Sequence, residues 1–223
     1  MHGFLEAIVA DFRSAKNDVN AAQMKAYMKD LFPFLGLKRP DRNFIQRNYL
    51  SNSQLPPTKE LPDLIRDLWA LDEREFQYLG LDILGKYNKQ FEPAHIELFE
   101  YLITNKSWWD TVDYLASNSV GSLFKTYPEL KEKWLSKWIA TDNMWLNRTA
   151  ILFQLKYKSS TDEGLLIKSI EAHIASTEFF HRKAIGWALR EYAKTNPQFT
   201  QDFVESHPEL SGLSKREALK NLN

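Results

Sequence analysis

The chain has 223 residues, 43% of them apolar, and its 29 basic residues balance its 29 acidic ones. It has no cysteine, which excludes disulfide bonds and cysteine-based zinc or redox sites. Its balanced charge does not indicate a nucleic-acid partner, so a DNA-binding protein of this composition would have to segregate its charges by face. We therefore expect a protein of a reducing compartment, the cytoplasm, that folds as a single domain over residues 1–223.

Apolar residues recur at helical spacing along most of the chain, and prolines stand mostly between these stretches. The first stretch resembles an amphipathic helix and not a signal peptide, and none reaches the roughly 18 to 20 apolar residues of a membrane span. An all-α protein is predicted, with helices at roughly 2–15, 18–33, 41–51, 58–70, 75–87, 92–105, 107–122, 128–140, 145–157, 162–175, 180–192, 197–206 and 213–222. Expected N-caps are Asn17, Ser107, Asp142 and Thr161.

Three of these segments end alike, in Tyr87, Tyr157 and Tyr192, and the last two tyrosines lie 35 residues apart. The first two are separated by twice that interval, and the segment 107–122 fills the gap. A fixed period of this length is typical of stacked helix pairs, because one pair cannot bury its apolar face without a neighbour. The predicted fold is a curved solenoid of HEAT-like antiparallel helix pairs, an α-α superhelix.

The period places equivalent residues of successive helices side by side. We call the residues Tyr78, Asp113, Arg148 and Lys183, each 35 after the last, the repeat row. Residues four or seven positions away on a helix share its face, which adds Trp109, Trp187 and Arg190. Core rows should be apolar, so this polar row is expected on the surface, and the concave surface of a solenoid is its usual binding face.

A carboxylate among indoles and cations suits a site on DNA, where Arg and Lys contact phosphates and indoles pack on sugars or bases. Asp113 could stabilise the oxocarbenium-like sugar that forms when an alkylated, cationic purine departs. The alternative is a solvated helix face with chance spacing. Two tryptophans exposed without a function would be unfavourable, so the set as a whole favours a binding site.

Around these residues the sequence resembles the AlkD family of DNA alkylation repair glycosylases, which are built from HEAT-like repeats. The most distinctive segments are KSWWDTVD from Lys106 to Asp113 and KAIGWALREYAKTNP from Lys183 to Pro197. The resemblance extends over nearly the whole chain, through residues 32–42, 68–84 and 137–158.

This resemblance implies a monomeric, monofunctional glycosylase without metal or cofactor. It would release N3- and N7-alkylated purines of the 3-methyladenine and 7-methylguanine type from double-stranded DNA, without inserting the base into a pocket. The catalytic aspartate of the family falls on Asp113, its two sugar-backbone tryptophans fall on Trp109 and Trp187, and its phosphate-contacting arginines fall on Arg148 and Arg190.

Further basic and aromatic residues are weaker candidates for DNA contact. Tyr27 resembles a DNA-facing tyrosine of the family and could equally be a core residue. Lys38 and Arg42 flank Pro40 in a predicted loop. Lys156 and Lys194 extend the basic edge of the face, where Lys183 of the repeat row is also a candidate for DNA contact. A helical-repeat module that binds DNA without catalysis remains the alternative function, and a protein-interaction scaffold is a third.

Overall fold

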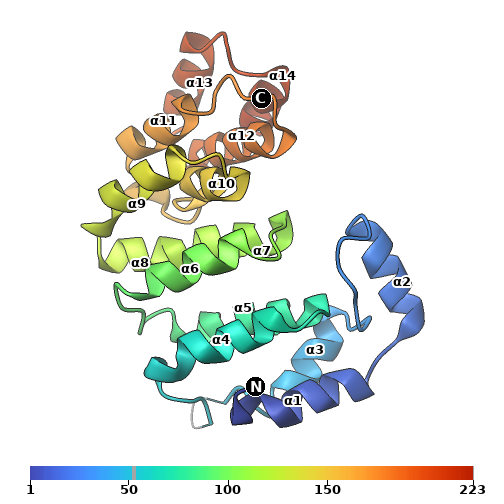
Figure 1. Ribbon diagram of the computed structural model, residues 1–223. Coiled ribbons are helices and arrows are strands. Elements are labelled where there is room, and N and C mark those ends of the chain that lie inside the picture. The colour runs from blue at the N-terminus through green and yellow to red at the C-terminus, as the bar shows by residue number, and fades with distance from the viewer. Residues whose placement is uncertain (52–53, 223) are drawn as a thin grey trace. The chain divides into compact units, whose positions relative to one another are not determined.

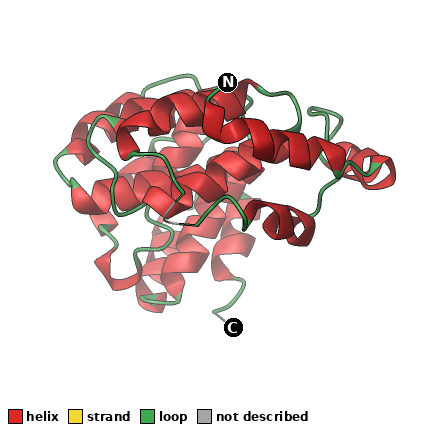
Figure 2. Ribbon diagram, turned by 90° about the horizontal axis from the view of Figure 1, so that it is seen from below, coloured by secondary structure: helices red, strands yellow, loops and turns green. Residues whose placement is uncertain are grey.

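The protein is described by a computed structural model that covers residues 1–51 and 54–222. These residues form helices and loops and no strand, as Figure 2 shows. The predicted all-α class is therefore confirmed. Within the same residues, every helix is too short or too polar to cross a lipid bilayer.

The chain divides into two compact units, Met1–Leu98 and Phe99–Asn223. The division falls within helix α6 (His95–Thr104), whose two halves belong to different units. The expectation of one domain over residues 1–223 stays a prediction.

The first unit holds the N-terminal helices, which Figure 1 draws in blue and cyan. They are α1 (Gly3–Ser14), α2 (Asp18–Tyr27), α3 (Arg39–Gln46), the 3-10 turn η1 (Thr58–Glu60), α4 (Leu61–Ala70) and α5 (Arg74–Tyr87). Apolar side chains of α1 and α5 form its core, where the rings of Phe12 and Phe76 stack with centroids 6.0 Å apart. Helix α3 packs on both α1 and α5, and α4 packs on α5.

Helix α2 has no buried side chain, so its position depends on the loop that follows it. Leu35, Gly36 and Leu37 donate their backbone N–H groups to the buried carboxylate of Glu75, at 2.8 to 3.0 Å. The carbonyl of Leu35 accepts the backbone N–H of Asn17 at 2.8 Å, and Asn17 caps α2 as predicted. The loop thereby ties the start of α2 to the core of this unit.

The second unit continues the alternation of short helices. They are α7 (Trp109–Tyr114), the π-helical segment η2 (Leu115–Val120), α8 (Gly121–Thr126), α9 (Leu130–Ile139), α10 (Met144–Leu152), the 3-10 turn η3 (Lys158–Ser160), α11 (Glu163–Glu171), α12 (Phe179–Ala193), α13 (Pro197–Ser206) and α14 (Gly212–Leu219). Helix α10 packs on α7 and η2, and also on α12, so helices one predicted period apart are neighbours in space.

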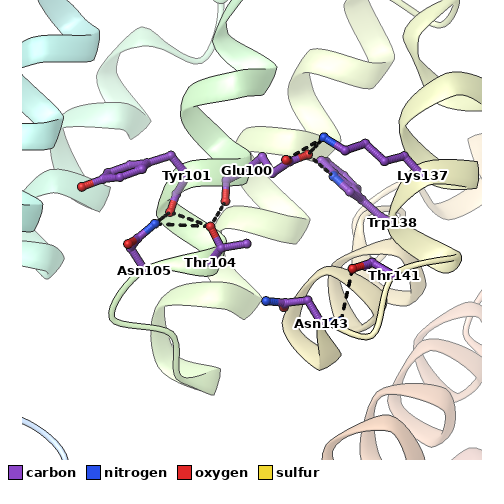
Figure 3. A network of polar contacts seen from close by, with 8 residues as sticks. All are labelled: Glu100, Tyr101, Thr104, Asn105, Lys137, Trp138, Thr141 and Asn143. Carbon is purple, nitrogen blue, oxygen red and sulfur yellow. Dashed lines mark hydrogen bonds and ion pairs between the residues drawn. The ribbon is translucent and has the colours of Figure 1, made fainter.

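Polar contacts join successive helix pairs of this unit, as Figure 3 shows for the C-terminal half of α6 and for α9. The carboxylate of Glu100 accepts hydrogen bonds from Lys137 Nζ at 2.7 Å and from Trp138 Nε1 at 2.8 Å. Trp138 is fully buried, so Glu100 satisfies an indole N–H that the core would otherwise leave unbonded.

Three expected N-caps are wrong by one residue. The caps are Trp108, Asn143 and Asp162, where the prediction gave the residue before each. The side chains of Asn143 and Asp162 accept backbone N–H groups of the first helical turn, which fixes those boundaries. Ser107 instead donates its hydroxyl to the carbonyl of Ile103 at 2.6 Å, so the expected capping box is absent at that position.

Four helices also end at least four residues earlier than expected, namely α2 at Tyr27, α3 at Gln46, α10 at Leu152 and α11 at Glu171. Helix α2 stops at Tyr27 because Lys29 and Asp30 both have positive φ, which breaks the helical path. The regular part of α10 stops at Leu152, followed by turns up to Tyr157.

Gly36 is predicted to be indispensable for the first unit. It has φ of +86°, and an added Cβ would lie 2.0 Å from the carbonyl oxygen of Asn17. Gly36→Ala should lower the free energy of unfolding by at least about 2 kcal/mol, because backbone strain and a clash with main-chain atoms add. Urea unfolding measures this. Gly3→Ala, where a Cβ meets nothing within 4 Å, is the control, and equal stabilities of the two variants would contradict the prediction.

Candidate active site

Asp113 and Arg148 meet directly across two neighbouring helices. Asp113 lies near the end of α7 and Arg148 in the middle of α10, one period later. Arg148 Nε donates to Asp113 Oδ1 at 2.7 Å, and Arg148 Nη2 donates to Asp113 Oδ2 at 2.8 Å. The two side chains thus form a bidentate ion pair, which fixes the plane of the carboxylate.

The third nitrogen of this guanidinium bonds to a third helix. Arg148 Nη1 donates to the carbonyl oxygen of Phe180 in the first turn of α12, at 2.6 Å. The Phe180 ring also lies 5.7 Å from the guanidinium carbon. Arg148 therefore joins α7, α10 and α12.

The expectation that Arg148 lies on an exposed surface is wrong, because only 5% of its side chain is exposed. Its three nitrogens all donate to protein oxygens, which is how a buried cation is stabilised. The adjacency of Asp113 and Arg148 in the repeat row is confirmed. The side chain acts here as the partner of Asp113.

Asp113 is partly shielded from solvent, with 14% of its side chain exposed. Burial is the largest influence on its pKa and raises it, the hydrogen bonds and charge of Arg148 lower it, and the charge of Asp110 raises it. The pKa of Asp113 lies above its usual value as a result. A carboxylate offers about four acceptor positions, and Arg148 occupies two of them, so acceptor capacity remains.

The helix changes its winding immediately after Asp113. Residues Leu115–Val120 form a π-helical segment, a feature frequent at functional sites. Ser117 Oγ donates to the carbonyl of Asp113 at 2.8 Å, and Asn118 Nδ2 donates to the carbonyl of Tyr114 at 2.9 Å. The backbone that carries Asp113 is therefore held by side chains of the next turn.

Lys156 reaches this segment from the turns after α10. Its exposed ammonium donates to Asn118 Oδ1 at 2.6 Å. Because this amide partner is uncharged, Lys156 keeps its positive charge close to the end of α7.

The two tryptophans of the predicted site are half-buried. Trp109 is the first residue of α7, and Trp187 in α12 packs against the apolar core of the second unit. The expectation of exposed indoles is therefore wrong in degree, since both residues have intermediate exposure.

An aromatic cluster lies beside the ion pair and was not anticipated from the sequence. The ring centroid of Trp108 is 5.7 Å from that of Trp145 and 5.2 Å from that of Phe180. Trp145 and Phe180 are one period apart, so the repeat itself could have indicated this contact. The cluster holds the start of α12, whose Phe180 carbonyl bonds Arg148.

Lys183 and Arg190, expected to be DNA-facing cations, share one protein partner. Both donate to the carboxylate of Glu217 in α14. Glu217 lay outside the candidates because its spacing from Lys183 is one residue short of the repeat. Contact of these two cations with DNA stays a prediction.

The remaining candidates lie in the first unit. Tyr27 is 71% exposed, which excludes the core alternative. Lys38 is an exposed residue at the N-cap of α3. Arg42 lies in α3, within the helix predicted from residue 41, but it differs from the expected DNA contact because its side chain is buried, with the guanidinium carbon 4.5 Å from the ring centroid of Tyr78. Burial also lowers the pKa of Arg42.

Within residues 1–51 and 54–222, no group of three or more His, Cys, Asp or Glu side chains is arranged to hold a metal ion.

Comparison with known proteins identifies the class. A family described as DNA alkylation repair enzyme matches residues 8–222. The chain belongs to this family of DNA repair enzymes. A solved structure described as a predicted DNA alkylation repair enzyme from Enterococcus faecalis is 34% identical, with a TM-score of 0.86, over 93% of this chain and 96% of that one. No curated protein matches the sequence.

The ion pair should behave as a coupled unit in stability measurements. Arg148→Met should cost about 3 to 5 kcal/mol of unfolding free energy, because it leaves a shielded carboxylate without its cation. Asp113→Leu combined with Arg148→Met should recover most of that loss. Urea unfolding of the two single variants and the double variant gives the coupling energy. Lys168→Met, which breaks the exposed pair with Glu132, is the control and should leave stability nearly unchanged. If the loss of unfolding free energy in the double variant equalled the sum of the losses in Asp113→Leu and Arg148→Met, the prediction would be contradicted.

Proposed function

We propose that this protein is a monofunctional DNA N-glycosylase that excises purines alkylated at N3 or N7 from double-stranded DNA. The observation that carries the proposal is the shielded Asp113 carboxylate, fixed by the bidentate contact of Arg148. Membership of the DNA alkylation repair enzyme family supports the choice of substrate.

The reaction needs one well-placed negative charge. A purine alkylated at N3 or N7 is a cation, so the bond from its nitrogen to sugar C1′ breaks with the electron pair leaving on the base, which departs neutral. The sugar becomes oxocarbenium-like, and a carboxylate nearby stabilises that positive charge. Water then adds to C1′ and loses a proton, either to the carboxylate or to solvent.

Arg148 is proposed to orient Asp113 and to keep it ionised. Burial alone favours the protonated carboxyl group, which could not stabilise a cation. The guanidinium opposes that tendency, and it holds both carboxylate oxygens in one plane. This role replaces the phosphate contact expected for Arg148, since all three of its nitrogens already donate to protein.

Side chains around Asp113 would contact the DNA backbone. Trp109 and Trp187 would pack on deoxyribose near the lesion, and exposed Lys156 would contact a phosphate. Tyr27 and Lys38 of the first unit are exposed and would contribute further contacts. Buried Arg42 is left out of this set. We propose that the protein acts as a monomer in the cytoplasm, without cofactor.

Loss of the Asp113 charge should abolish most base release. Asp113→Asn keeps the shape and one acceptor and removes the charge, so release of 7-methylguanine from methylated duplex DNA should fall roughly 100-fold to 1,000-fold. Chromatography of released base, with a chelator present, measures this. Asp110→Asn in the same helix is the matched control and should retain most activity near pH 8.

A normal rate for Asp113→Asn would defeat the enzymatic proposal. A wild type that binds methylated DNA but releases no base would instead favour the DNA-binding module.

The pH dependence should report the ionisation of Asp113. Only the ionised form stabilises the sugar cation, so the enzymatic rate should fall as pH decreases from neutral towards the raised pKa of Asp113. Arg148→Lys should move the midpoint upward, because Arg148 lowers this pKa, and Asp110→Asn should move it downward, because Asp110 raises it. Rates are corrected for spontaneous depurination. Shifts in the opposite directions would rule out Asp113 as the titrating group.

A further inference from the structure

Two cations of α12 flank Trp187 and converge on one carboxylate. Lys183 precedes Trp187 by one helical turn and Arg190 follows it by nearly one. Lys183 Nζ donates to Glu217 Oε1 at 2.9 Å, and Arg190 Nη1 donates to Glu217 Oε2. Each carboxylate oxygen therefore holds one cation.

Close packing of α14 on α12 places Glu217 next to the two cations. A Cβ on Gly186 would lie 2.5 Å from the Cβ of Glu217 and 2.9 Å from the carbonyl of Ser214, so the two helices touch at this glycine. Ser214 Oγ also donates to the carbonyl of Arg182 at 3.0 Å. These contacts fix the backbone of α14, whereas the Glu217 side chain projects along the face that carries Trp187.

The cluster keeps one net positive charge and stays accessible. Lys183 and Arg190 contribute two positive charges and Glu217 one negative charge, and the hydrogen bond of Lys183 is the largest of the influences that lower the pKa of Glu217. The exposed fractions of the three side chains run from 19% for Glu217 to 36% for Lys183. Solvent, and hence a dissolved anion, can reach them.

Contact of Lys183 and Arg190 with a backbone phosphate is already an expectation from the sequence. We infer that Glu217 occupies the place of that phosphate in the free protein, as an internal substitute that must be displaced when DNA binds. The inference rests on the DNA binding included in the proposed function. A phosphodiester presents two non-bridging oxygens, as a carboxylate does, so it can take over both hydrogen bonds without moving either cation.

Glu217 weakens DNA binding because it competes with the phosphate for the same two cations. To bind DNA, its side chain must leave both cations and remain near a phosphate of the same charge. The two cations also stay in place beside Trp187 when no DNA is bound, because the carboxylate holds them. DNA affinity is therefore lower than the two cations alone would give.

The test compares salt dependence of binding to an unmodified duplex. Each neutralised phosphate adds about 0.9 to the slope of log affinity against log salt. Glu217→Gln raises the cluster from one net positive charge to two, so it should steepen the slope by up to about 0.9 and tighten binding roughly threefold to tenfold at 0.1 M salt. Lys183→Gln should weaken binding, and Lys183→Gln with Glu217→Gln should return close to wild type.

The matched control is the exposed ion pair between Glu132 of α9 and Lys168 of α11. Glu132→Gln and Lys168→Gln change the net charge of the protein by the same amounts at a pair outside α12. Equal effects at both pairs, or no change of slope in Glu217→Gln, overturn the inference. Should Glu217→Gln not fold by circular dichroism, Lys183→Gln and Arg190→Gln decide, because unaltered slopes in both overturn it.

This experiment separates the inference from the proposed function. DNA binding that responds to Glu217→Gln, in a wild type that releases no alkylated base, supports the inference and defeats the glycosylase proposal. If the wild type releases alkylated base but Glu217→Gln leaves DNA binding unchanged, the glycosylase proposal is supported and the inference is defeated. A wild type that does not bind DNA defeats both.

Discussion

The candidate site depends on keeping a carboxylate charged in a place that disfavours charge. Asp113 is mostly shielded from water, and burial pushes its pKa upward. The Arg148 guanidinium offsets this, and it in turn needs a third acceptor, the Phe180 carbonyl. One cation therefore lowers the pKa of the acid against the effect of burial, fixes its orientation and also joins three helices, so the candidate site and the packing of the second unit share the same contacts.

The repeat explains why such a site arises between helices. Successive helices place equivalent residues next to one another, and a core would normally fill those positions with apolar side chains. Here an acid and a base one period apart form an ion pair, and the aromatic cluster of Trp108, Trp145 and Phe180 packs beside them. The π-helical segment after Asp113 adds side-chain support for its backbone.

Cations of the second unit fall into three kinds. Arg148 is buried and structural, Lys156 is exposed beside a neutral amide, and Lys183 and Arg190 share Glu217. Under the proposed function these cations would contribute differently to DNA affinity, since a phosphate would have to displace a carboxylate at the last pair and only a neutral group at Lys156. A net charge of zero is thus compatible with a DNA partner, because pairing inside the protein decides which cations are available.

Local pattern and the 35-residue period determined the all-α class, nearly every helix, the cap at Asn17 and the adjacency of Asp113 to Arg148, because each depends on spacing along the chain. Tertiary structure decided the rest. Whether a cation is exposed depends on partners from distant helices, which is why buried Arg42 and Arg148 and the Glu217 contact could not be deduced from spacing. Exact caps depend instead on hydrogen bonds between residues two to four positions apart, such as those that Asn143 accepts from the backbone N–H groups of Trp145 and Leu146, and a 35-residue period does not resolve such a difference of one residue.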